Sequence, residues 1–131
     1  MMTLLIDAIH CLISSDEEGT LESRTLNTEL AEHLKNLNRT VIVVTDVWWD
    51  NYKKVRELLS DYNFETFTLE NSPKKENPDY FDHLLMYYGL AEEECIYLDH
   101  AQENLDAAQE LGIQGELFVN NKQAIEYLKS L

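Results

Sequence analysis

The sequence has few of the residues that build disulfide frameworks or cationic surfaces. Its 131 residues include two cysteines, two prolines and four glycines, and ten lysines and arginines stand against 25 acidic residues, for a formal net charge of −15. Two cysteines do not make a disulfide framework in a chain of this length, so we expect Cys11 and Cys95 to be reduced thiols. The scarcity of cations argues against binding of nucleic acid or an anionic membrane, because both require clustered lysine and arginine.

Long apolar runs are also missing. No run approaches the roughly 20 residues that a membrane-spanning helix needs. The first residues carry no basic segment, and Asp7 interrupts their apolar stretch, which is atypical of a secretory signal. Apolar residues still make up 44% of the chain, which is typical of a globular protein rather than a disordered one. We therefore expect one cytoplasmic domain over residues 1–131.

Short β-type runs alternate with helix-type patterns along the chain. Strands are expected at residues 3–6, 41–44, 64–69, 95–98 and 116–119. Helices are expected at residues 26–37, 51–62 with Asp50 as N-cap, 78–88 before Gly89, 102–111, and 121–128 with Asn120 or Asn121 as N-cap. Residues 14–23 match neither pattern and are expected to form a loop or small hairpin. Five strands separated by helices predict an α/β fold, a three-layer αβα arrangement with a parallel sheet and helices on both faces.

Polar side chains follow three of the expected strands. The residues in question are Asp7, Thr45, Asp46, Asp99 and His100. Lys74 and Lys75 lie in the loop after the third strand, just before the helix start at Asn77 and Pro78. In an open parallel sheet, ligands bind beyond the carboxyl ends of the strands. Taken alone, each of these residues is explained equally well as a turn former or helix cap. Together they predict one crevice, provided that the first, second and fourth strands are neighbours.

Three stretches of this sequence resemble the haloacid dehalogenase-like (HAD) superfamily. They are "LLIDAIHCLI" at residues 4–13, "VIVVTD" at 41–46 and "KENPDYFDHLLMYYGLAEEECIYLDHAQENLDAAQELGI" at 75–113. The resemblance implies a Rossmann-like sheet with strand order 5-4-1-2-3. Only 37 residues lie between Asp7 and Thr45, so it also implies a member without a large cap domain.

The resemblance assigns roles to several of the strand-end residues. It implies that Asp7 is the nucleophile that attacks a phosphoryl group, that Thr45 hydrogen-bonds the phosphate, and that Lys75 neutralises both, with Lys74 as a less well-placed alternative. It implies a magnesium site formed by Asp7, Asp99 and His100. The crevice would further include Ile9, His10, Asp46 and Asn104, the last matching a helix residue of the family.

Several positions depart from the family pattern. Ile9 stands where the family carries the aspartate that protonates the leaving group, and an alkyl side chain cannot transfer a proton. His10 stands where a glycine normally forms a tight turn, and Cys11 where threonine or valine is usual. His100 replaces a carboxylate that binds magnesium, which prefers oxygen ligands. These departures predict a weakened magnesium site and impaired phosphatase chemistry.

Three functions remain open on these grounds. The first is a non-catalytic binding or regulatory module on the HAD scaffold, whose partner is a phosphorylated small molecule or protein. The second is a capless magnesium-dependent phosphatase that uses Asp7, with Glu17, Glu18, Asp46 or His10 lending the proton. The third is a transition-metal site formed by His10, Cys11, Asp99 and His100. Dehalogenation is disfavoured, because an open site cannot desolvate a carbon–halogen displacement.

Overall fold

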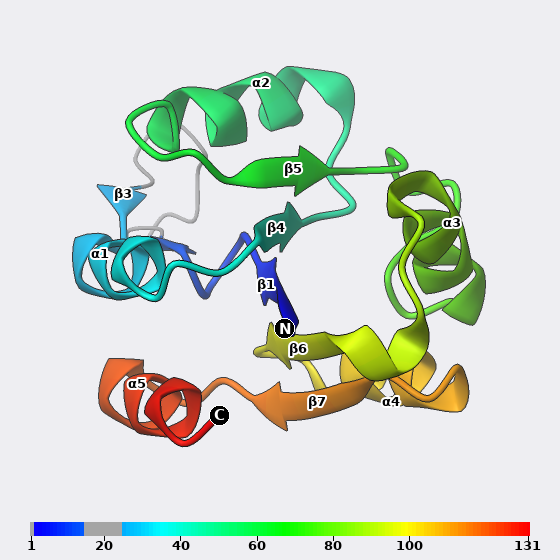
Figure 1. Ribbon diagram of the computed structural model, residues 1–131. Helices are drawn as coiled ribbons and strands as arrows, with labels where there is room; N and C mark the ends of the chain where they lie inside the picture. Colours follow the sequence, from blue (N-terminus) through cyan, green and yellow to red (C-terminus); the bar gives the residue numbers. More distant parts are fainter. Residues whose placement is uncertain (1, 15–24) are drawn as a thin grey trace.

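The computed structural model describes residues 2–14 and 25–131 and is built on a parallel sheet (Figure 1). From edge to edge the order is β5-β4-β1-β6-β7. The strands are β1 (Thr3–Asp7), β4 (Val41–Val44), β5 (Glu65–Phe67), β6 (Cys95–Asp99) and β7 (Gln114–Leu117). The predicted strands 1 to 5 correspond to β1, β4, β5, β6 and β7. In that numbering the observed order is 3-2-1-4-5, which is the predicted order 5-4-1-2-3 read from the opposite edge. The fold class is therefore confirmed, with β1 at the centre.

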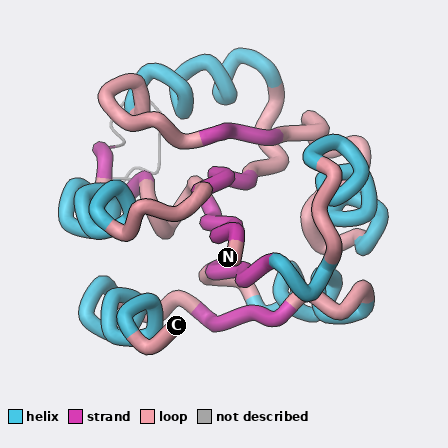
Figure 2. The backbone as a smooth tube through the Cα atoms, viewed as in Figure 1, coloured by secondary structure: helices cyan, strands magenta, loops and turns pink. Residues whose placement is uncertain are grey.

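Helices cover both faces of this sheet. They are α1 (Thr28–Asn36), α2 (Trp49–Leu58), α3 (Pro78–Tyr88), α4 (Gln102–Glu110) and α5 (Asn121–Lys129), with a short 3₁₀ turn at Glu92–Glu94. Alternate residues of β1 point to opposite faces. Leu4 and Ile6 pack in one core cluster with buried residues of α1, α2 and α5, whereas Leu5 packs in the other with those of α3 and α4. Figure 2 shows these helices flanking the strands on both sides.

Helix ends follow local chemistry that the sequence displays. Asn77 caps α3 by accepting a hydrogen bond from Asp79 N, Pro78 occupies the first turn, and Gly89 ends the helix with φ of 65°. Asn120, rather than Asn121, caps α5 by accepting from Gln123 N. The Asn77 cap fixes the point at which the loop carrying Lys75 enters the helix.

Several predicted boundaries are wrong. β7 spans residues 114–117 rather than 116–119, because its register follows β6, with Ile96 opposite Gln114 and Asp99 opposite Leu117. β5 is limited to residues 65–67, and α1 begins at Thr28.

The helix expected at 51–62 instead spans Trp49–Leu58. Trp48 is its N-cap, without a side-chain cap hydrogen bond, so the prediction that Asp50 caps this helix is wrong. Asp50 lies in the first turn, where its charge interacts favourably with the helix dipole.

A small antiparallel pair flanks the predicted loop. β2 (Ile13–Ser14) pairs with β3 (Thr25–Leu26), but residues 15–24 lie outside the described part of the chain, and with them Glu17, Glu18 and most of that loop. Among the helices of residues 2–14 and 25–131, none combines the length and apolar character that crossing a bilayer requires.

Candidate functional site

The sheet brings the predicted strand-end residues to one place. β1 pairs in parallel with β4 on one side and β6 on the other, so the three strands end together. A cavity of about 340 Å³ lies at these ends. Its lining consists of Asp7, Ile9, His10, Thr45, Asp46, Val47, Asn51, Lys75, His100 and Asn104. Eight of the nine predicted site residues therefore line one crevice. The ninth, Asp99, lies fully buried beneath it.

Asp7 is buried and engaged at both carboxylate oxygens. Lys75 donates through Nζ to Asp7 Oδ1, and His100 Nδ1 lies 2.6 Å from Oδ2. Cys11 also donates its thiol to Oδ2, with a sulfur–oxygen distance of 3.4 Å. The predicted nucleophile is thus held by a lysine, an imidazole and a thiol of its own chain.

Asp99 plays a supporting role. Its Oδ2 accepts from Lys75 Nζ at 3.1 Å and also from the Tyr97 hydroxyl. Its Oδ1 accepts from Ala101 N at 2.8 Å, and Asn104 Nδ2 lies 3.3 Å from Oδ2. A carboxylate with this many donors is satisfied within the protein. Asp99 therefore orients the lysine, and the structure does not bring it to the cavity surface.

The charges of the network stabilise one another. Burial alone would raise the pKa of Asp7, but Lys75 and His100 outweigh it and hold that pKa below its usual value. Burial would likewise lower the pKa of Lys75, but Asp7 and Asp99 raise it. Burial and the charge of Asp7 raise the pKa of Asp99. The hydrogen bond with Asp7 raises the pKa of His100, which favours the imidazolium. Lys75 thus faces two acidic side chains, and Asp7 favours the protonated form of His100.

The raised pKa of His100 makes a testable contribution to stability. Because the folded-state value exceeds the unfolded one near 6.5, the contribution is fully present below that pH and is lost as pH rises through the folded value. We expect the stability gap between wild type and His100→Gln, measured by urea unfolding from pH 5.5 to about 9, to narrow with increasing pH. A difference in stability between the two proteins that stays constant over this pH range would contradict a raised pKa of His100 in the folded protein.

The turn after β1 keeps a tight conformation without glycine. His10 has φ of 75°, in the left-handed region that side chains with a Cβ rarely adopt. Hydrogen bonds from His10 N to Ile13 O, at 2.8 Å, and from Ile13 N to Ala8 O, at 2.9 Å, close the turn. The His10 and His100 rings meet edge to face, with centroids 4.9 Å apart. The backbone demand that the family meets with glycine is therefore met here by histidine.

This turn predicts a difference between two variants. His10→Gly and His10→Ala both lose the imidazole, but only glycine adopts the left-handed conformation without strain. We expect His10→Gly to be more stable than His10→Ala by about 1 kcal/mol, measured by urea unfolding. Equal stabilities would show that the turn carries no strain.

The remaining predicted residues define what the crevice can do. Ile9 lines the cavity and packs partly against the core, so no acid or base stands at its position. Thr45 is buried, and its Oγ1 accepts from Val47 N at 3.3 Å, which leaves the hydroxyl hydrogen for another partner. Asp46 is half-buried and accepts from Lys75 N at 3.3 Å. Among the described residues, Asp46 and His10 are the proposed proton donors that reach the crevice.

Sequence reasoning missed Tyr97, Val47 and Asn51. Tyr97 lies two residues before Asp99 on β6. Because residues two apart on a strand share a face, their contact could have been predicted from this spacing. Val47 lies in the loop before α2 and Asn51 in its first turn, and the helix begins two residues earlier than predicted.

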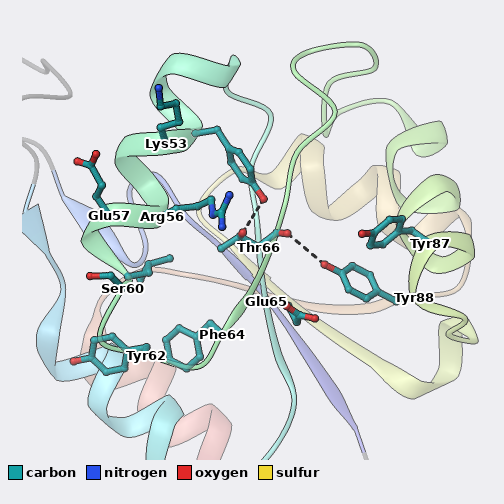
Figure 3. Close-up of a pocket in the computed structure, with 12 residues that line it drawn as sticks. Lys53, Arg56, Glu57, Ser60, Tyr62, Phe64, Glu65, Thr66, Tyr87 and Tyr88 are labelled. Carbon is teal, nitrogen blue, oxygen red and sulfur yellow. Dashed lines mark hydrogen bonds between the residues drawn. The ribbon is translucent and has the colours of Figure 1, made fainter.

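A larger cavity lies away from the strand ends. It encloses about 690 Å³ between α2, the edge strand β5 and the end of α3 (Figure 3). Tyr52 hydrogen-bonds Thr66 Oγ1 at 2.7 Å, and Tyr88 donates to Thr66 O at 3.3 Å. These tyrosines cap polar groups of an edge strand that has no further strand beside it. The smaller cavity, with its buried ion pairs, is the better candidate site.

Comparison with solved structures reveals relatives of this fold. A HAD family enzyme from Bacteroides thetaiotaomicron, in complex with magnesium and inorganic phosphate, superposes with a TM-score of 0.71 at 18% identity over 89% of this chain and 93% of that one. The chain has the fold of HAD-family enzymes. An uncharacterized protein from Corynebacterium glutamicum gives 0.74 at 16% identity over 99% and 93%. A HAD-superfamily hydrolase from Geobacter sulfurreducens gives 0.69 at 12% over 88% and 85%.

Sequence comparison adds no relative. No protein-family model and no curated protein matches the chain.

The donor set at this HAD-like site does not suit magnesium. Magnesium requires oxygen ligands in octahedral geometry. Asp99 is satisfied by protein donors and does not line the cavity, so Asp7 is the one carboxylate of the implied magnesium set, Asp7, Asp99 and His100, that does. His100 presents nitrogen where the family presents a carboxylate. The described residues therefore do not fit the metal that the fold implies.

Proposed function

We propose that this chain is a HAD-like binding module that holds a phosphorylated ligand, a small molecule or a protein, without hydrolysing it. The observation that carries the proposal is the engagement of Asp7 at both oxygens by Lys75 and His100. Hydrogen bonds to both oxygens make a carboxylate a poorer nucleophile, and Ile9 supplies no acid for the leaving group. The free thiols of Cys11 and Cys95 fit a reducing compartment, so the proposal places the chain in the cytoplasm.

Charge balance supports binding of a phosphoryl group in the crevice. Lys75 and a protonated His100 offset Asp7 and Asp99, so the network itself does not repel an anion. The Thr45 hydroxyl and the amides of Asn51 and Asn104 line the same cavity and are suitable hydrogen-bond donors.

A titration with inorganic phosphate, followed by amide NMR shifts, tests the binding half of this proposal. We expect saturable shifts at the ends of β1 and β4 in the wild type, and binding about tenfold weaker or more in Thr45→Val, since a hydrogen bond to a charged group is lost. Thr40→Val, an exposed site at the opposite end of β4, is the matched control and should bind as wild type does. Absence of saturation in wild type would overturn it.

The specific alternative is a phosphatase that takes its proton from Asp46, whose side chain lines the cavity. It requires turnover that is lost in both Asp7→Asn and Asp46→Asn. Turnover with that pattern would replace the binding proposal.

A further inference from the structure

Three different metal-ligating side chains meet at the carboxyl end of β1. Asp7, Cys11 and His100 each offer one ligand atom, and these atoms all lie within 4.8 Å of one another. Within the described residues, this is the one such group of three or more histidine, cysteine or acidic side chains. The sequence suggested His10, Cys11, Asp99 and His100 instead. In the structure Asp7 joins Cys11 and His100, whereas Asp99 and His10 are not part of this group.

The ligand chemistry favours zinc-like cations over magnesium. A thiolate, an imidazole and a carboxylate form a donor set that zinc accepts at about 2.0–2.3 Å, which places ligand atoms of a tetrahedral site roughly 3.3–3.8 Å apart. Asp7 Oδ2 lies 3.4 Å from Cys11 Sγ and 2.6 Å from His100 Nδ1. Movements of these ligand atoms by about 1 Å would therefore bring them to three of the four ligand positions of a tetrahedral site.

The surrounding structure holds two of these ligands in position. Lys75 occupies the other oxygen of Asp7, so Oδ2 remains the one directed to Cys11 and His100. The closed turn fixes Cys11, whose carbonyl accepts from Asn27 Nδ2 at 2.9 Å. His10, with its ring 4.9 Å from that of His100, is the nearest imidazole to a fourth position.

We propose that Asp7, Cys11 and His100 bind a thiophilic divalent cation of the zinc class. The cation takes the place of the protons that join these side chains in the metal-free protein: the thiol proton and any proton that His100 shares with Asp7 leave to solvent, and Zn–S, Zn–N and Zn–O bonds form. No electron transfer is involved. This inference concerns the cation alone and does not rest on the binding of a phosphorylated ligand.

The test uses the full chain after treatment with a chelator. Zinc is titrated in competition with a chromophoric chelator, and cobalt is added separately as a spectroscopic probe. We expect one zinc per chain, a zinc-dependent rise in melting temperature, and the near-ultraviolet thiolate-to-cobalt absorption in the wild type. Cys11→Ser should abolish the cobalt band and weaken zinc at least tenfold, and His100→Gln should weaken zinc to a similar degree.

Cys95→Ser is the matched control. Cys95 is also a buried free thiol, but it lies at the opposite end of β6 and donates to Ala91 O. This variant should bind zinc and cobalt as wild type does. The proposal is overturned by absence of stoichiometric zinc in the wild type, by a missing thiolate–cobalt band, or by unchanged zinc affinity in folded Cys11→Ser. The wild-type cobalt spectrum decides the matter even if a variant fails to fold.

Discussion

Lys75→Met is expected to lower the free energy of unfolding by about 3–5 kcal/mol, because it leaves two buried carboxylates without their cation. Lys75 is 4% exposed and bridges Asp7 and Asp99, which are 1% and 0% exposed. Methionine preserves most of the apolar part of the lysine side chain, so the decrease in stability reports the removal of the charge. Urea unfolding of both proteins at neutral pH measures the difference.

Two further variants make this result specific. Lys74→Met removes an exposed lysine from the adjacent position and should change stability by no more than about 0.5 kcal/mol. Adding Asp99→Asn to Lys75→Met removes one of the stranded carboxylates and should recover part of the lost stability, as coupled residues do in a double-mutant cycle. A Lys75→Met protein as stable as Lys74→Met would mean that the network does not hold the site together.

The second large effect is a gain of activity. Ile9→Asp together with His100→Asp places carboxyl groups at the two positions where the resemblance to HAD enzymes implies the proton donor and a magnesium ligand. We expect this double variant to hydrolyse a generic phosphomonoester in a magnesium-dependent manner, with roughly 10²–10⁴-fold of the gain attributable to general acid–base catalysis. Each single variant should gain little, because either the acid or the metal site is still missing.

The stability of the double variant provides an independent readout. His100→Asp removes one cation and adds a third carboxylate beside Asp7 and Asp99, so the protein should melt at a lower temperature without magnesium and recover when it is added. Ile9→Asn with His100→Asn is the uncharged control, and we expect neither hydrolysis nor a response to magnesium. Activity in this control would attribute the gain to something other than the restored carboxylates.

Much of the site could be predicted because the ends of the strands can be recognised in the sequence. Apolar runs that stop at Asp7, Thr45 and Asp99 indicate parallel strands, and parallel strands present their carboxyl ends together. Lys75 is 68 residues from Asp7 along the chain. Its loop position predicted that a lysine reaches the crevice, and the family resemblance selected Lys75 over Lys74. The same resemblance implied the strand order, which the sheet confirms.

What could not be predicted depends on side-chain direction and on register. Nothing in the amino-acid sequence shows that His100 directs Nδ1 to Asp7 Oδ2, or that the thiol of Cys11 donates to the same oxygen. The pattern predicted the last strand at residues 116–119, but its pairing with β6 ends where Leu117 lies opposite Asp99. Tertiary pairing, which is absent from local sequence, sets such boundaries.

The most direct test of the account is hydrolysis by the unaltered protein. Wild type and Asp7→Asn are assayed side by side on a generic phosphomonoester with excess magnesium, each after a chelator wash. Because Asp7 is held by Lys75 and His100 and no acid stands at Ile9, wild type is expected to release phosphate no faster than Asp7→Asn. Magnesium-dependent release by wild type that disappears in Asp7→Asn would contradict the account.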